Sequence, residues 1–505
     1  MKNSAVVPSL AAGAGILVSV LVAGGVAAIG VEGEWVWRRV MPVAWLAAVP
    51  TVGLGLALAG GVAALCARRP RVAATLCLLA VGGFVLQAAV GYVSVLPVSG
   101  EAAIVTIAPY VGGYFHQATR VTDTWEFVRG YGEWMRGINL ADRVLGHLGD
   151  HPPGLVLFYV AQLRLMEAAP WAARSVNSVA SAVVPGGGDV AHAVAGTDLT
   201  EAQLAAVWLS GWLLRLLMAL TVIPFYAVAK RICEQEAALK CAVIFSFVPA
   251  MHLFSPSPDQ LFVLSSVLMA YLVVKEWQER EVWPGALAGV LMFVALNLTV
   301  GLVVLVVLGV IAGALSGFAR VRAGEGGAAL SARICGTVGA GAGAFLICLA
   351  ACGVAGYSAV EVWLIALRKH AEFGGLFERT YWKWVLMNPL EFWAFLGVPA
   401  GAMVLWRVAL GVSRARVKSL GLDVPLLSIV ILLLLLNLSG KNPGEVARLW
   451  MFLMPFVVLG GCKALEQVEM KMVAAMAGSQ VIQIVAFKLA LDIFSIRMLG
   501  GLMPG

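Results

Sequence analysis

Long apolar runs separated by short polar segments make up most of this chain. A helix that crosses a bilayer needs about 20 mainly apolar residues, so such runs predict membrane-spanning helices. We assign spans to residues 8–29, 41–65, 72–96, 204–229, 241–254, 261–274, 284–298, 301–318, 334–353, 392–410, 426–438, 446–460 and 472–490. The predicted fold is therefore an all-α polytopic membrane protein with about thirteen transmembrane helices.

The same pattern divides the chain into three regions. Residues 1–97 form an N-terminal three-helix membrane segment, and residues 98–201 form the longest region without a standard span. Residues 202–505 are a transmembrane core with a second loop at 355–391. Inside the first loop, the apolar run from Gly154 to Met166 is too short to cross a bilayer. We therefore predict interfacial or re-entrant helices in this loop.

Basic residues decide which side of the membrane each loop occupies. Lys2 and the arginine cluster at 68–71 flank the first spans, and cytoplasmic loops are enriched in Lys and Arg. Counting residues 154–166 as non-crossing places the later basic clusters on the same side. The predicted extracytoplasmic positions are Asp123, His151, Asp259, Lys441 and the carboxy terminus.

Composition supports a membrane protein, because 61% of the residues are hydrophobic and only 12% are charged. Soluble classes of protein are excluded by this balance. The net charge of +7 comes from clusters between apolar runs, so it indicates membrane orientation rather than a nucleic-acid partner. The eight cysteines include no C-x-x-C pair, which argues against a zinc site or a disulfide scaffold. We expect them to be buried packing residues.

The stretch from Thr122 to Phe158 is polar where its surroundings are apolar. Carboxylates and imidazoles in such a setting need water, a substrate or a metal to stabilise their charge. Asp123 lies in an aromatic segment suited to the membrane interface, where a general base would meet a lipid-borne substrate. The alternative is that Asp123 caps a helix, with Glu126 completing a capping box.

A second motif places Asp150 and His151 directly before Pro152, Pro153 and a new apolar helix. Such a position suits helix capping, and it equally suits a catalytic or ligand-binding pair. Asp259 precedes another apolar helix and is either an N-cap or, with the other acids and His of this face, a candidate ligand for a divalent cation. No cofactor is certain.

Candidate phosphate-binding residues gather at the start of a late span. Arg448 and Glu445 are one helical turn apart and either pair with each other or bind the phosphate of a donor, with Lys441 close by. Arg215 and Arg379 are further candidates of the same kind. We interpret His370 and Glu372 in the second outer loop as a solvated face, with an acceptor groove as the alternative.

With these pieces in order, the chain resembles the GT-C superfamily of membrane glycosyltransferases, in particular the branch of the protein O-mannosyltransferases and aminoarabinose transferases. The matching segments are TDTWEF at 122–127, HPPG at 151–154, SPSPDQLFVL at 255–264 and GEVARLWMFLMP at 444–455. The chain departs from that pattern in two respects. It has two additional spans before the loop, and it lacks the Asp-Glu pair of the first-loop base.

The resemblance implies a glycosyltransferase of the plasma or inner membrane. It would transfer a sugar from a polyprenyl-phosphate-linked donor to a glycan, lipid or protein acceptor on the extracytoplasmic face. An inverting transfer with Asp123 as base is implied, in a GT-C-like catalytic first loop. Two rivals stay open. A transporter or flippase of lipid-linked substrates would carry charges near the bilayer midplane, and a non-catalytic scaffold subunit would tolerate loss of Asp123 and Asp259 together.

Overall fold

The computed structural model of the chain describes residues 6–40, 45–67, 71–93, 101–108, 113–139, 148–376, 378–415 and 423–494. Helices connected by turns and loops make up most of the described residues. The strands among them are one short hairpin, in which β1 (Gly30–Val31) pairs antiparallel with β2 (Trp35–Val36), and one isolated bridge between Arg39 and Leu491. The predicted all-α class is confirmed. Lys2 and the carboxy terminus, which entered the sequence predictions, lie outside the described residues.

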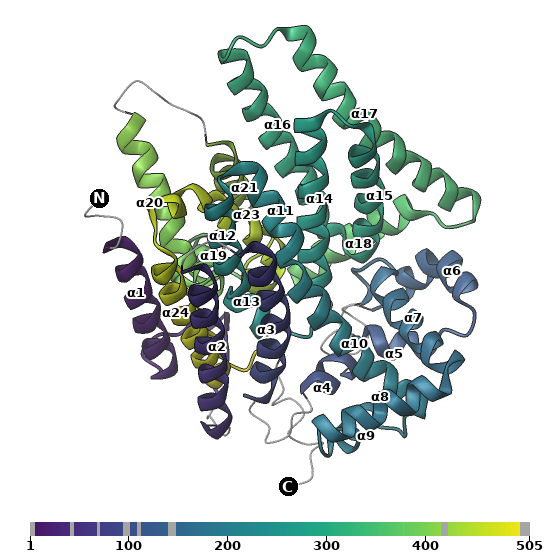
Figure 1. Cartoon of the computed structure of the whole chain (residues 1–505). Coiled ribbons are helices and arrows are strands. Elements are labelled where there is room, and N and C mark those ends of the chain that lie inside the picture. The colour runs from purple at the N-terminus through teal and green to yellow at the C-terminus, as the bar shows by residue number, and fades with distance from the viewer. Residues whose placement is uncertain are drawn as a thin grey trace.

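The two ends of the described chain pack against each other (Figure 1). The first three helices are α1 (Val6–Ala23), α2 (Trp45–Cys66) and α3 (Val72–Tyr92). Both α1 and α2 pack against the last helix, α24 (Met470–Ala490). In α1 and α2 most side chains face outward from the bundle, as expected of apolar helices in lipid.

The remaining core helices follow a group of six helices that occupies residues 101–195. They are α10 (Glu201–Leu220), α11 (Val222–Ile232), α12 (Gln235–Ser246), α13 (Pro249–Leu253), α14 (Gln260–Glu279), α15 (Val282–Leu298), η2 (Val300–Val303), α16 (Val304–Arg322), α17 (Gly327–Val354), α18 (Ala359–Gly375), α19 (Tyr381–Leu396), α20 (Val398–Ala415), α21 (Val424–Ser439), α22 (Val446–Leu449), η3 (Met451–Leu453), α23 (Met454–Gly460) and η4 (Cys462–Gln467).

The expected count of thirteen spans is not confirmed. Among the described residues, 8 helices are long and apolar enough to cross a membrane, or up to 9 if the bent pair α19–α20 counts as one. Proline explains two of the shortfalls, because it ends a helix that would otherwise continue. The expected span at 241–254 breaks before Pro249, and the one at 446–460 is split into α22, η3 and α23, the last with Pro455 in its first turn.

Residues 101–195 fold into short helices at one end of the bundle (Figure 1). They are α4 (Glu101–Ile107), α5 (Tyr114–Ala118), α6 (Thr124–Gly137), α7 (Gly154–Ala168), α8 (Pro170–Val183) and α9 (Gly187–Ala195). Helix α7 has 15 residues and packs against α5 and α10. Its length agrees with the prediction that residues 154–166 do not form a standard span.

Helices α16 and α17 extend from the opposite end of the bundle (Figure 1). Helix α17 packs so closely against α15 that any side chain at Gly289 would collide with the backbone of Gly341. None of the most apolar window of α17 is buried within the protein. A helix of this kind is stable only in an apolar surrounding such as lipid.

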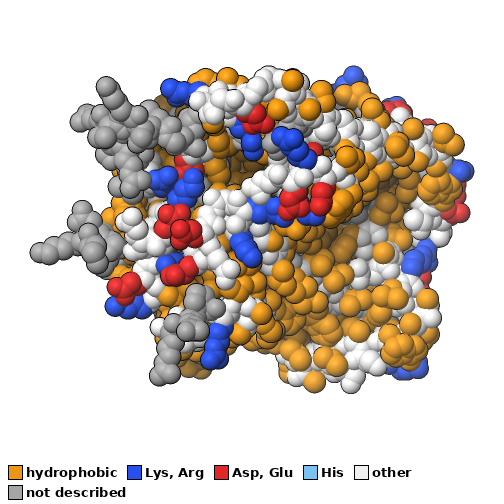
Figure 2. Space-filling view, turned by 45° about the horizontal axis from the view of Figure 1, so that its top comes forward, with side chains coloured by type: hydrophobic (Ala, Val, Ile, Leu, Met, Phe, Trp, Pro, Cys, Tyr) orange, Lys and Arg blue, Asp and Glu red, His pale blue; other side chains and the backbone are white. Residues whose placement is uncertain are grey.

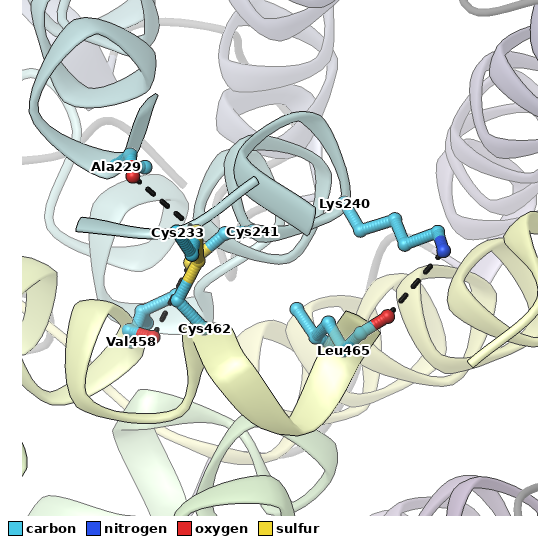
Figure 3. Close-up of a disulfide and its surroundings, with 7 residues drawn as sticks. All are labelled: Ala229, Cys233, Lys240, Cys241, Val458, Cys462 and Leu465. Carbon is cyan, nitrogen blue, oxygen red and sulfur yellow. Dashed lines mark hydrogen bonds between the residues drawn. A yellow bond between two sulfur atoms is a disulfide. The ribbon is translucent and has the colours of Figure 1, made fainter. Parts of the chain in front are cut away.

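Two cysteines correct the expectation of unlinked packing residues. Cys233 at the end of α11 forms a disulfide with Cys462 at the start of η4, across 229 residues of sequence (Figure 3). Local spacing motifs carry no information about such a distant pair. Of the other cysteines, Cys241 is buried nearby and donates to the Val458 carbonyl, whereas Cys77 and Cys335 are exposed on their helices.

The sidedness of the two ends can be tested with single cysteines. We expect a membrane-impermeant maleimide to label an Asp198→Cys variant in intact cells and to label a Gly326→Cys variant only after permeabilisation. Asp198 lies in the loop before α10 and Gly326 in the turn before α17, and both are exposed. Cys77 and Cys335 are replaced by Ser in the background. Labelling of the Gly326→Cys variant in intact cells would show that the assigned orientation of the two ends is inverted.

Candidate functional site

Asp150 and His151 form a pair at the start of α7. The Nδ1 atom of His151 lies 2.7 Å from Oδ1 of Asp150, and the hydroxyl of Tyr131 on α6 donates to the His151 carbonyl at 2.9 Å. The first residue of α7 lies directly against α15, so closely that a side chain at Gly154 would collide with the Asn297 carbonyl. The pair is therefore fixed from both sides by neighbouring helices.

A second imidazole reaches Asp150 from α18. The Nδ1 atom of His370 on α18 lies 3.2 Å from Oδ2 of Asp150, so each carboxylate oxygen faces one histidine. Only 9% of the Asp150 side chain is exposed. Burial alone would raise the pKa of Asp150, but the positive charge that His151 carries once it is protonated, together with the hydrogen bonds of His151 and His370, outweighs it. The net pKa lies well below its usual range, so Asp150 is ionised at neutral pH.

Asp259 and Arg448 approach each other at the same end of the bundle. The hydroxyl of Ser257 donates to Oδ2 of Asp259 at 2.5 Å, and that oxygen lies 3.9 Å from Nε of Arg448. Nη2 of Arg448 lies 3.7 Å from Glu445. Both separations are too long for hydrogen bonds. Within the described residues the Arg448 guanidinium donates no hydrogen bond, although its Nε is buried.

Tyr114 lies beside the first group and within electrostatic reach of the second. Its ring meets the His151 ring edge to face, with the ring centres 5.7 Å apart. Burial raises the pKa of the Tyr114 phenol well above its usual value, with the carboxylates of Asp150 and Asp259 adding to the rise and Arg448 opposing it. Tyr114 therefore keeps its proton and can only donate to an anion placed between these side chains. Sequence reasoning missed it, since no motif marks a tyrosine in a five-residue helix.

The segment that carries Arg448 is held by two side chains of α19. Asn388 donates to the Asn442 carbonyl at 2.9 Å and accepts from the Gly444 amide at 3.0 Å. Glu391, one turn later, accepts from the Ala447 amide at 3.1 Å. These bonds satisfy an irregular backbone that would otherwise be costly in a membrane protein.

Arg379 ties the same segment to the N-terminal hairpin. Its guanidinium stands over the rings of Trp35 and Trp384 at 5.8 and 5.4 Å, and it bonds the Pro443 carbonyl. Glu34 of the hairpin accepts from the backbone amide of Thr380 and from Lys383 and Trp384. These hydrogen bonds, led by those of Thr380, lower the pKa of Glu34 to about 2.

The other candidate residues lie elsewhere. Asp123 is the N-cap of α6 and accepts from the amides of Trp125 and Glu126 at 2.7 and 2.9 Å. The carbonyl beside it, that of Thr122, is held by Arg164, ten residues along α7 from Gly154. That spacing corresponds to about 15 Å along the helix. Asp123 is thus distant from the Asp150 pair, and its role as base stays a prediction.

Arg215 and Lys441 also stand apart from Arg448. Arg215 is 6% exposed and lies in a buried group with Glu101 and Lys488, which form an ion pair. Lys441 is exposed at the end of α21. Neither is brought to the Arg448 guanidinium by the described contacts.

The described residues contain no group of three or more His, Cys, Asp and Glu side chains arranged to hold a metal ion. Asp259 instead faces Arg448. Neither a scan against protein-family models nor a search of curated proteins found a match for this chain.

The cap at Asp123 gives a direct test by thermal unfolding. Asn caps helices as well as Asp does, whereas Ala does not. We expect Asp123→Asn to melt at the wild-type temperature and Asp123→Ala to melt lower. Equal melting of the Ala and Asn variants would mean that the cap contributes nothing to α6.

Proposed function

We propose that the protein is an integral membrane glycosyltransferase that transfers a sugar from a polyprenyl-phosphate-linked donor to an acceptor hydroxyl at the extracytoplasmic face. The observation that supports this most is that an ionised acid–histidine pair and an arginine whose guanidinium donates no hydrogen bond within the described residues both act electrostatically on the same phenol, that of Tyr114. One group suits proton transfer and the other suits a phosphate, and both lie at the same end of the helical bundle.

The proton acceptor is assigned to the Asp150–His151 pair. Asp150 stays ionised, and a carboxylate with a low pKa is a weak base but a good partner for an imidazolium. The pair takes the proton of the acceptor hydroxyl as its oxygen bonds to the anomeric carbon. The bond from that carbon to the phosphate oxygen breaks at the same time, and polyprenyl phosphate leaves. A single displacement of this kind inverts the anomeric centre.

The leaving phosphate is assigned to Arg448 and Tyr114. A guanidinium binds phosphate through two parallel N–H bonds, and charge stabilisation of a leaving group is a large catalytic effect. Tyr114 adds a neutral donor on the side of His151. Asp259 and Glu445 keep Arg448 oriented at distances that leave its donors to a ligand.

A transporter of lipid-linked substrates is the second candidate, because Glu101, Arg215 and Lys488 are charged side chains buried among α4, α10 and α24. Buried ionisable groups of this kind occur along transport pathways. The two functions differ in where the donor collects when the gene is deleted. A transferase leaves donor on the outer leaflet, and a transporter leaves it on the inner one.

Asp150→Asn tests the proton acceptor. In a deletion strain we expect lipid-linked sugar to accumulate on the outer leaflet by mass spectrometry. The wild-type gene should clear this lipid-linked sugar, whereas the turnover of the Asp150→Asn variant should be about 100- to 10,000-fold lower than that of the wild type. Asp189→Asn, an exposed acid on α9, is the matched control. If the Asp123→Asn variant fails to clear the lipid-linked sugar and the Asp150→Asn variant clears it at the wild-type rate, the base is Asp123 instead.

Arg448→Lys tests the phosphate contact. Lys keeps the charge but loses the planar two-point contact, so donor use at limiting concentration should fall by about tenfold or more while folding is kept. Arg174→Lys on the exposed face of α8 serves as control. If the Arg448→Lys variant has the wild-type turnover, Arg448 does not bind the donor phosphate and serves only as a partner of Glu445 at the helix end.

A further inference from the structure

An open cavity of about 350 Å³ lies at the end of the bundle away from the candidate site. It is formed where α14 and α16 end and α21 begins, and it is lined by Trp277, Gln278, Ser316, Ala319, Arg320, Ala323 and Val424. Trp277 is 18 residues along the chain from Asp259, or about 27 Å at the rise of an α-helix. That length is close to the thickness of a bilayer core. The cavity therefore lies at the opposite membrane boundary from Asp259.

The lining combines an aromatic ring, a cation and a hydroxyl. The Arg320 guanidinium stands 5.9 Å from the centre of the Trp277 ring. Its Nη1 also lies 3.0 Å from Glu325, which Arg280 approaches at 3.7 Å. The Ser316 hydroxyl makes no hydrogen bond with the described residues. Tryptophan and arginine together are typical of the membrane–water boundary.

Charge around the cavity is positive on balance. The ion pairs there are Arg231–Glu279, Lys275–Glu279, Lys275–Glu281, Arg280–Glu325, Arg320–Glu325 and Arg407–Asp423. Arg322 adds a further cation, so the basic side chains outnumber the acidic ones. Figure 2 shows basic and acidic side chains gathered among broad hydrophobic surfaces on this side of the molecule.

We propose that this cavity binds the phosphate headgroup of an anionic phospholipid in the leaflet opposite the candidate site. Basic pockets between transmembrane helices at this boundary attract anionic headgroups. Arg320 meets the phosphate, Ser316 donates to it, and Trp277 packs against the glycerol and upper chains. The cavity volume falls within the range of small-molecule sites, about 300–1,000 Å³. This inference is independent of the proposed function.

Native mass spectrometry of the full-length protein in detergent tests the assignment, with phosphatidylglycerol and phosphatidylcholine as the probes. We expect wild type to retain phosphatidylglycerol in preference to phosphatidylcholine. Loss of one interfacial cation should weaken that retention about fivefold, so Arg320→Gln should show this loss. Arg322→Gln, on the same helix but outside the cavity lining, is the matched control and should lose less retention than Arg320→Gln, because it removes a nearby charge but no contact with the headgroup.

Glu325→Gln separates binding from folding. This variant removes the anion that competes for Arg320, so we expect it to increase phosphatidylglycerol retention. If the ion pair has only a structural role, Glu325→Gln should instead lose retention as Arg320→Gln does. Equal retention by the Arg320→Gln and Arg322→Gln variants overturns the proposal. Displacement of the lipid by millimolar inorganic phosphate also overturns it, because the site would then recognise a soluble anion.

Discussion

The candidate site depends on how an irregular backbone is satisfied inside a membrane protein. Water cannot complete the hydrogen bonds of a broken helix at membrane depth, so the protein itself must do so. Asn388 and Glu391, one turn apart on α19, bond the amides of Gly444 and Ala447 and the carbonyl of Asn442. Because those groups are satisfied, the chain can bend before α22 and present Arg448 outside a regular span. The break that removes a predicted span is the same one that positions the arginine.

Sequence reasoning reached the fold class because long apolar runs determine it without reference to tertiary contacts. It expected single spans where the structure has broken helices, in runs that were short and contained a proline, as at Pro249 and Pro455. In those places the apolar residues are buried by other helices rather than by lipid, and composition alone does not distinguish the two surroundings. The pair Cys233 and Cys462 shows the same limit, since its partners are brought together only by tertiary packing, in which α12, the helix after Cys233, packs against η4 and α23.

The site shows which contacts a sequence can reveal. Asp150 and His151 are neighbours in the chain, and Arg448 and Glu445 are one turn apart, so local spacing identified both groups. His370 and Tyr114 reach the cluster from separate helices, and nothing in their own surroundings marks them. His370 was interpreted as part of a solvated face, and 44% of its side chain is indeed exposed, yet its ring also meets a buried carboxylate.

Charge distribution separates the two halves of the site. Asp150 is surrounded by imidazoles and has a pKa below its usual range, so it takes a proton poorly by itself. Its value to a reaction is to stabilise a positive charge that appears on His151. On the other side, Asp259 and Glu445 approach Arg448 without hydrogen-bonding to it, which holds the cation in place without neutralising its donors. Tyr114 stays protonated between them because burial and two carboxylates oppose its ionisation. An incoming anion would therefore meet donors on the Arg448 side and a proton acceptor on the His151 side, which is the polarity that the proposed transfer from a phosphate to a hydroxyl requires.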